Sequence, residues 1–408
     1  MDAQPPTPAI APARINREHT LGLRAVVGRE VRRIAARRTN AMLVLVLPLL
    51  GWVLLRSVFG AHVVRDLPVV VIDGDHSELS RRVARAIEAT PVVRVVDKRA
   101  DVSDAEGILL RGDAYAVVVM TAGMQRAVAR NERAPVQLFT NGQWMLPASL
   151  ITRDVRAAVG TISAELDVRN RVARGATLAG AQVSAEPIRS ELHPLYNPAL
   201  DYAAFLFLAL VPTLLHVFVL ALSVQALGSE LKDGSAGEWI ACSNDNVFIA
   251  TVGKLLPYTL WFTALGIAMV EGALRSLNLP MAGSRLLLYA GLLLLVLAYQ
   301  AIALLLVAFT ANFRLSTSVA AFIAGPAFAV AGVSFPRAAM PPAGQAWSAA
   351  LPISHFLQLQ IEQVIADASI RVSLPLLGVL ALFAVVLPTI SLRRMGFVTR
   401  TPSFWGRI

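Results

Sequence analysis

The chain has 408 residues, of which 56% are hydrophobic and 16% are charged. Soluble domains are about 45–50% apolar and about 25% charged, so this composition indicates a membrane protein and excludes an intrinsically disordered chain. The single cysteine, Cys242, excludes a small domain held together by disulfides.

The net charge of +10 is concentrated at the two ends of the chain. Residues 1–40 contain eight arginines and three acidic residues, whereas residues 391–408 contain four arginines and no acid. Because these arginines flank apolar segments, we interpret them as a signal that retains both termini in the cytoplasm. A nucleic-acid-binding surface is the less favoured explanation, and we predict no nucleic-acid partner.

The predicted cytoplasmic N-terminus, residues 1–40, contains an amphipathic stretch over residues 21–38. Its arginines lie largely off one apolar face of the expected helix, which is formed by Leu23, Val26, Val27, Val31 and Ile34. We expect this helix to lie in the membrane interface.

Six apolar segments are each long enough to cross about 30 Å of hydrocarbon. They are residues 41–59, 203–227, 252–274, 286–309, 315–334 and 372–391. The first is interpreted as a signal anchor, because a polar region too long for a signal peptide precedes it. The other five are expected to form a bundle over residues 203–392. Six spans place both termini, including a tail over residues 393–408, in the cytoplasm.

Between the first two spans, residues 60–202 are balanced in charge and predict an inserted extracytoplasmic α/β domain. Strands are expected at 67–73, 92–96, 114–120 and 135–139, and helices at 77–89, 103–111, 122–131 and 145–178. This alternation predicts a small, mostly parallel sheet with helices on its faces. Ser77 is the expected N-cap of the first of these helices.

The sequence contains few signals for chemistry. A strand that ends at Asp73 and Gly74 is reminiscent of a nucleotide fold, but no Gly-x-Gly-x-x-Gly follows, so an interaction domain is favoured. No P-loop motif occurs, and the expected cytoplasmic segments are too short for an ATPase domain. The scattered histidines predict no metal site, and we predict no catalytic residue. His216, midway along the second span, is either a packing residue or a proton relay.

Several stretches carry a resemblance to a known family. They include DLPVVVIDGDHSELSRRVARAIEAT (66–90), LYNPALDY (195–202), GSELKDGSAGEWIA (228–241) and GVSFPRAAMPPAGQAWSAALPISHF (332–356). In this order and spacing they resemble the ABC-2 type transporter permease family, in the branch with a large periplasmic domain between the first two membrane helices. The resemblance implies the membrane subunit of an exporter in a bacterial inner membrane. ATP and Mg would bind a separate ATPase chain, and no cofactor would bind this one.

The resemblance also implies partners and sites. The partners are a cytoplasmic ABC ATPase, a second permease subunit (an identical chain or a close paralogue), a periplasmic adaptor and membrane lipid. The loop 228–251 would dock the ATPase through Glu230, Lys232, Asp233, Gly234, Glu238 and Trp239. An external hairpin, residues 335–371, would form an exit gate with Phe335, Pro336, Pro352, His355 and Phe356.

Two other functions stay open on the sequence. One is a membrane receptor or assembly factor that uses the α/β domain and transports nothing. The other is an ion-coupled secondary transporter, which would depend on His216 and would work without ATP.

Overall fold

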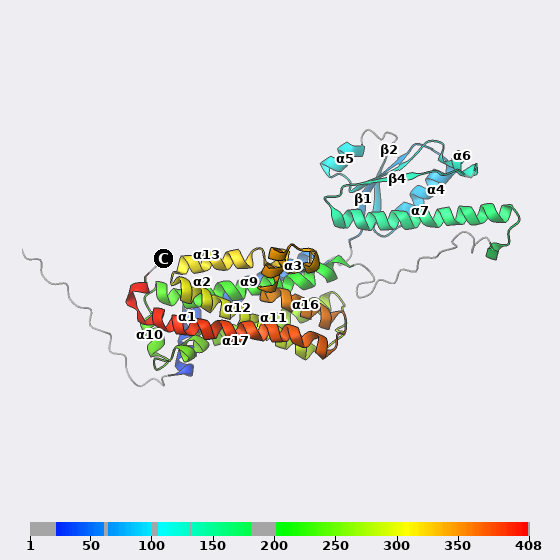
Figure 1. Cartoon of the computed structure of the whole chain (residues 1–408). Coiled ribbons are helices and arrows are strands. Elements are labelled where there is room, and N and C mark those ends of the chain that lie inside the picture. Colours follow the sequence, from blue (N-terminus) through cyan, green and yellow to red (C-terminus); the bar gives the residue numbers. More distant parts are fainter. Residues whose placement is uncertain (1–21, 61–63, 100–104, 131, 181–200, 407–408) are drawn as a thin grey trace, which may run out of the picture. The chain divides into compact units, whose positions relative to one another are not determined.

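The computed structural model describes residues 22–60, 64–99, 105–130, 132–180 and 201–406. The chain divides into two compact units (Figure 1). A helical unit comprises Met1–His62 and Tyr202–Ile408, and an α/β unit comprises Val63–Asp201. Two parts of the sequence discussed above lie outside the described residues. They are residues 195–200 of the stretch LYNPALDY (195–202) and the first 21 residues of the predicted N-terminal region.

The helical unit is built from long helices and short connecting ones. Before the α/β unit come α1 (Leu23–Ala36), α2 (Arg38–Ala41), a π-helical turn η1 (Met42–Val46) and α3 (Leu47–Val58). After it come α9 (Tyr202–Lys232), α10 (Ala236–Ala241), α11 (Val247–Ser276), α12 (Arg285–Thr310), α13 (Phe313–Ala324), α14 (Ala327–Val330), η3 (Arg337–Ala339), α15 (Pro342–Ala349), α16 (Pro352–Val364), α17 (Ile370–Arg400) and η4 (Pro402–Phe404).

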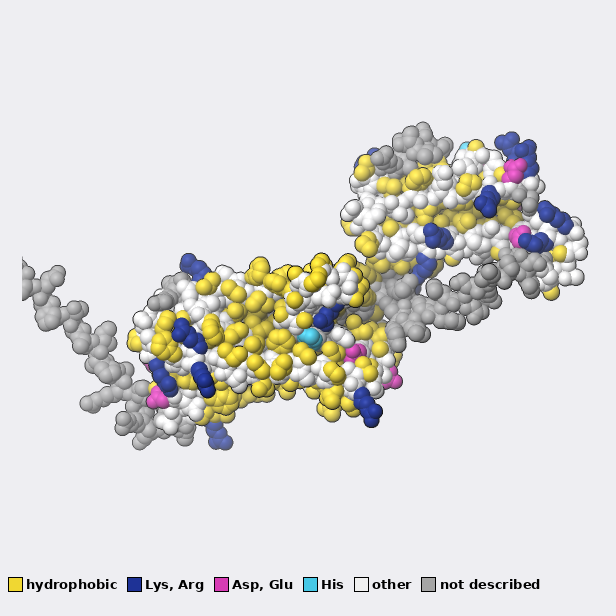
Figure 2. All heavy atoms as spheres, in the orientation of Figure 1, with side chains coloured by type: hydrophobic (Ala, Val, Ile, Leu, Met, Phe, Trp, Pro, Cys, Tyr) yellow, Lys and Arg dark blue, Asp and Glu magenta, His cyan; other side chains and the backbone are white. Residues whose placement is uncertain are grey.

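Within the described residues, six helical stretches are long and apolar enough to cross a membrane, as the sequence predicts. They are Arg38–Val58, Tyr202–Lys232, Val247–Ser276, Arg285–Thr310, Phe313–Val330 and Ile370–Arg400. On the face that Figure 2 shows, hydrophobic side chains form a broad band along this unit, and basic side chains gather at the end where α10 and the C-terminus lie. The protein is therefore a multi-pass membrane protein.

The last helix is longer than the apolar pattern indicates. The predicted span ends at residue 391, before Arg393 and Arg394, whereas α17 continues to Arg400. Its last turns are held by packing, because Met395 and Val398, three residues apart, are buried against the rest of the helical unit. The first eight residues of the predicted tail are therefore helical.

Close helix packing in the core depends on glycine. An added Cβ at Gly266 of α11 would lie 2.6 Å from a methyl group of Leu215 in α9 and 2.8 Å from one of Leu292 in α12. Small residues let membrane helices approach one another closely, which compensates for the lack of a hydrophobic driving force between helices in lipid. Gly266 therefore fixes the place where α11 packs against α9 and α12.

The α/β unit contains a four-stranded sheet with the strand order β2-β1-β3-β4. The strands are β1 (Leu67–Asp73), β2 (Val93–Arg99), β3 (Ala116–Met120) and β4 (Val136–Thr140). β1 is parallel to β2 and β3, and β4 is antiparallel to β3, so the sheet is mostly parallel as predicted. Its helices are α4 (Glu78–Glu88), α5 (Ala105–Arg111), α6 (Met124–Ala129) and α7 (Met145–Ala173).

The two faces of the sheet are buried by different helices. Val69 and Val71 point to a core shared with Ile87 of α4 and Ile151 of α7, while Ile72 points to a core shared with α5. Burial on both faces explains why β1 reads as an almost continuous apolar run. The predicted N-cap is confirmed, since the Ser77 hydroxyl accepts a hydrogen bond from the Ser80 amide.

Two aspartates, Asp73 and Asp75, stabilise the loops that follow β1 and precede α6 by accepting hydrogen bonds from backbone amides. Asp73 accepts hydrogen bonds from the amides of Asp75 and His76, at 3.1 and 2.9 Å. Asp75 in turn accepts from the amides of Gly123 and Gln125, at 2.7 and 3.0 Å, and so satisfies free N–H groups at the start of α6. The Asp-Gly sequence therefore has a structural role here.

Replacing Asp75 with asparagine is expected to loosen α6. Partial burial alone would raise the pKa of the Asp75 carboxyl. The hydrogen bonds that this carboxylate accepts from Ser77, Gln125 and Gly123 outweigh burial, so its pKa is lowered overall. Losing the charged acceptor should cost about 1 kcal/mol, so the amides of α6 should exchange with deuterium about fivefold faster at pH 7. The stabilisation from a lowered pKa is present above the ordinary pKa and is lost on acidification. The difference between variant and parent should therefore shrink as the pH falls below 3.8, the ordinary pKa of an aspartate, and through the lowered pKa of Asp75. Asp113→Asn serves as the control.

Candidate functional site

Helix α1 is fixed to the helical unit by one narrow face. Val26 is 1% exposed, and it packs where α11 has Gly253, whose added Cβ would lie 2.8 Å from the Cβ of Val26. The amide of Gly22 also donates to the Cys242 carbonyl at 2.9 Å. Leu23 and Val31 stay 43% and 49% exposed, which leaves part of the apolar face available to a membrane interface.

The buried face of α1 carries charges that meet charges of α9 and α11. We call Arg29, Glu30, Arg33, Glu230 and Lys254 the charge cluster. The Glu230 carboxylate accepts from the Arg29 guanidinium at 2.6 and 3.0 Å, from Lys254 Nζ at 2.6 Å, and from Arg33. Glu230 is 0% exposed, so this carboxylate is surrounded by three cations inside the chain.

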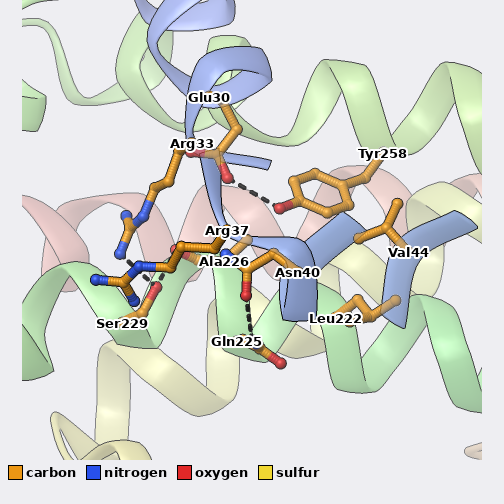
Figure 3. A pocket seen from close by; sticks show the side chains of 10 residues that line it. All are labelled: Glu30, Arg33, Arg37, Asn40, Val44, Leu222, Gln225, Ala226, Ser229 and Tyr258. Carbon is orange, nitrogen blue, oxygen red and sulfur yellow. Dashed lines mark hydrogen bonds between the residues drawn. The ribbon is translucent and has the colours of Figure 1, made fainter. Parts of the chain in front are cut away.

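Glu30 completes the charge cluster on the other side of Lys254. Its carboxylate accepts from Lys254 Nζ and, at 2.9 Å, from the Tyr258 hydroxyl (Figure 3). Glu30 is 2% exposed and Lys254 is 0% exposed. A single buried ammonium therefore bridges one carboxylate of α1 and one of α9.

The cost of burying these charges depends on their mutual pairing. Each buried ion loses several kcal/mol of hydration, which is regained only when geometry and hydrogen bonding are good. Burial alone would lower the pKa of the Arg29 guanidinium, but the hydrogen bond and the charge of Glu230 outweigh burial and raise that pKa overall. A cavity of about 40 Å³ adjoins the cluster between Arg33, Ser229 and Tyr258, enough for a water molecule (Figure 3).

Trp239 of α10 lies against the same cluster. Its side chain is 0% exposed, its Nε1 donates to the Ala250 carbonyl at 3.1 Å, and Lys254 Nζ lies 5.5 Å from its ring centre. The Ser235 hydroxyl, just before α10, donates to Glu230 at 2.5 Å. The indole and Glu230 therefore hold the loop between α9 and α11 in place from the inside.

The other four residues predicted to dock an ATPase lie on the surface. Lys232, Asp233, Gly234 and Glu238 are exposed. Lys232 Nζ lies 5.2 Å from the ring centre of Phe313, and Asp233 pairs with Arg33 at 3.1 Å. Gly234 has a φ of 68°, which the turn after α9 requires and which glycine adopts without strain.

The C-terminal end of the chain covers the same loop. The amide of Gly406 donates to the Leu231 carbonyl at 2.9 Å, and Arg400 donates to the Asp245 carbonyl at 2.8 Å. The Trp405 ring lies where a Cβ on Gly237 would come within 3.0 Å of it. Helix α1, the loop 233–246 and the tail 401–406 thus form one junction at one end of the helical unit.

The predicted gate residues occupy two different environments. Phe335 and Pro336 are exposed, with Phe335 at 51%. Pro352, His355 and Phe356 are buried at the start of α16, where His355 Nε2 lies 2.9 Å from the Ala349 carbonyl oxygen. Burial lowers the pKa of His355, so this ring favours its neutral form.

His216 is a buried packing group of α9. It is 0% exposed, and its ring centre lies 4.8 Å from that of Tyr299 in α12. Among the described residues, the two ring nitrogens of His216 have no hydrogen-bond partner, and neither does the Tyr299 hydroxyl. A role for His216 in proton transfer stays a prediction.

The charge cluster contains four residues that sequence reasoning did not select as a site: Arg29, Glu30, Arg33 and Lys254. Glu30 is an acid in an arginine-rich helix, and Lys254 is a cation within a span. Lys254 is unexpected, because ionisable groups inside a membrane segment are costly unless they are paired, and Glu30 near the start of the chain is an acid that could serve as its partner. Glu30 and Lys254 are therefore the residues by which the sequence could indicate a buried ion pair. That these two residues, 224 positions apart, pair with each other is visible only in the structure.

Comparison with known proteins identifies the family. Residues 41–393 match the model of the ABC-2 family transporter proteins. The chain belongs to this family. It is also 24% identical over 350 residues to proteins named "Probable multidrug ABC transporter permease YbhR" from Escherichia coli strains K12 and O157:H7, which covers 82% of this chain and 88% of each relative.

Membership in the ABC-2 family establishes the general role of the chain. It is a membrane permease of an ABC transporter, a class of subunit that works together with an ATPase subunit. The ABC-2 resemblance inferred from the sequence is thereby confirmed, whereas the branch with a periplasmic domain stays a prediction.

Proposed function

We propose that this ABC-2 permease is the membrane subunit of an exporter driven by a separate cytoplasmic ATPase that binds ATP and Mg. The observation that carries the proposal is the junction, in which the loop 233–246 is fixed from inside by the charge cluster and Trp239. A push on the exposed side of such a loop is transmitted to α1, α9 and α11, since buried ion pairs connect all three. Rigid, discretely packed elements of this kind carry coupling between distant sites.

The docking residues divide between two tasks in this proposal. Lys232, Asp233, Gly234 and Glu238 present the contact surface to the ATPase, and Glu230 and Trp239 hold that surface in position. Both termini lie in the cytoplasm of a bacterium and the α/β unit lies outside the inner membrane. The grouping of basic side chains at the junction end of the helical unit supports this orientation (Figure 2).

We also propose a substrate class, further protein partners and an outer gate. Drug molecules are the proposed substrate class, because the E. coli relatives are named as probable multidrug permeases. Two permease chains, identical or closely related, form the pathway, and the α/β unit binds a periplasmic adaptor protein. Phe335, Pro336, Pro352, His355 and Phe356 form the outer gate.

The test is co-purification of the full chain from native membranes in mild detergent. Glu238→Lys reverses a charge on the exposed side of α10 and should lower the retained P-loop ATPase about tenfold, which corresponds to about 1.4 kcal/mol. Glu78→Lys, the same change on the exposed side of α4, is the matched control and should retain the ATPase fully.

Either of two results would contradict the exporter. An intact chain that never retains an ATPase, even after cross-linking, would favour a receptor or assembly factor. Substrate movement in vesicles without ATP that is abolished by His216→Phe would favour a secondary transporter.

A further inference from the structure

A second cavity lies within the membrane-spanning part of the helical unit, between α11, α12 and α17. Its volume is about 240 Å³, and its walls include Leu255 of α11, Ala301 of α12 and Ala384 of α17. An apolar cavity of about 150 Å³ already accommodates a benzene molecule. A space of this size is therefore large enough for a ligand.

The cavity opens toward the side of the helical unit. Phe248 and Val252, at its rim on α11, are 60% and 36% exposed, whereas Ala301 at its back is 3% exposed. The side of a membrane-spanning helix faces hydrocarbon, so the molecules present at this opening are lipids. The exposed rim and the buried back form a slot that is open to the acyl chains of the bilayer.

Two polar groups without regular partners lie in the walls. Thr251 is 4% exposed, and its hydroxyl has no hydrogen-bond partner among the described residues. On the facing wall, Pro388 has no N–H to give to the carbonyl four residues before it, which belongs to Ala384. A buried unpaired donor in an apolar slot is costly, and a ligand with an acceptor oxygen removes that cost.

The depth of the cavity corresponds to one leaflet. Helix α11 has 30 residues and is about 45 Å long, so it exceeds a hydrocarbon layer of about 30 Å and its first turns lie at the interface. Thr251, in the second turn, is thus at the level of lipid ester groups. The cavity continues from there for about 12 Å to Thr259, which is most of the way to the bilayer centre.

We propose that this cavity binds one acyl chain of a membrane phospholipid, whose ester carbonyl accepts a hydrogen bond from the Thr251 hydroxyl. The chain lies along Leu255 and Ala301 and ends near Thr259 and Gln300, whose side chains are paired with each other at 2.8 Å. The bound lipid fills the space between α11, α12 and α17.

The test uses the full chain in vesicles of phosphatidylethanolamine and phosphatidylglycerol. A trace of phosphatidylethanolamine with a photoreactive diazirine in one acyl chain is added, and the labelled peptides are mapped after irradiation. We expect labelling to be concentrated on residues 248–259, 297–304 and 384–392. Thr251→Val, which keeps the shape and removes the hydroxyl, should lower this labelling about fivefold.

Two further variants separate binding from general damage. Thr263→Val is the matched control, because Thr263 also lies in α11 with a buried unpaired hydroxyl but does not line the cavity. It should label like the parent chain. Ala384→Leu narrows the slot from its partly exposed wall and should reduce labelling at least tenfold.

Uniform labelling of the lipid-facing helices, including the exposed Leu374 and Leu382 outside the three segments, would overturn the proposal, as would unchanged labelling of Ala384→Leu. A photoreactive aryl diazirine without a headgroup provides a last comparison. If that probe labels the three segments and the phospholipid does not, the cavity takes small apolar molecules and the lipid proposal fails.

Discussion

Lys254→Met is expected to destabilise the helical unit by about 3–5 kcal/mol, because it removes the cation that bridges Glu30 and Glu230. Methionine has a similar length, so the change removes charge more than volume. Glu230 would keep Arg29 and Arg33, but Glu30 would keep only the Tyr258 hydroxyl as a side-chain partner among the described residues. Thermal unfolding of the full chain in detergent should show a midpoint lowered by about 10 °C.

Lys232→Met is the control for this prediction. Lys232 lies two residues after Glu230, is exposed and contacts only the ring of Phe313 among the interactions described, so its loss should change the midpoint little. The double variant Lys254→Met with Glu30→Gln should recover a good part of the loss, since it removes the uncompensated carboxylate as well. Strictly additive effects of the two substitutions would show that the bridge does not exist.

The large elements of this fold follow from simple sequence patterns. The six spans are predictable because about 20 apolar residues are needed to cross a bilayer, whatever the helices pack against. Strand β1 and helix α4 are likewise predictable, since an apolar run followed by Ser77 as N-cap is a local signal. Local signals of this kind do not depend on tertiary contacts.

The junction is not predictable in the same way. In the sequence Trp239 looks like an exposed anchor for a partner, because it stands in a short charged loop. Its burial depends on Lys254 and Ala250, which belong to the next helix, and α10 also packs against α17, far along the chain. The end of α17 is likewise not predictable from the apolar pattern, because Met395 and Val398 are held by tertiary packing that outweighs the nearby arginines.

Trp239→Ala is expected to have the second large effect, again through stability. Truncating a fully buried tryptophan costs about 3–5 kcal/mol, from lost apolar burial and the cavity that remains. Trp347→Ala is the matched control, because Trp347 lies in the same unit with 37% exposure and its truncation leaves a smaller void. The two variants are compared by thermal unfolding of the full chain.

The comparison with Glu238→Lys decides what Trp239 does. If Trp239 holds the loop from inside, Trp239→Ala lowers both the unfolding midpoint and the retained ATPase, while Glu238→Lys lowers the ATPase alone. Trp239→Phe should restore most of both quantities, because a phenyl ring still offers an aromatic face to the Lys254 ammonium and gives up only the hydrogen bond to Ala250. An unchanged midpoint in Trp239→Ala, together with loss of the ATPase, would instead mean that the indole leaves its pocket and contacts the partner directly.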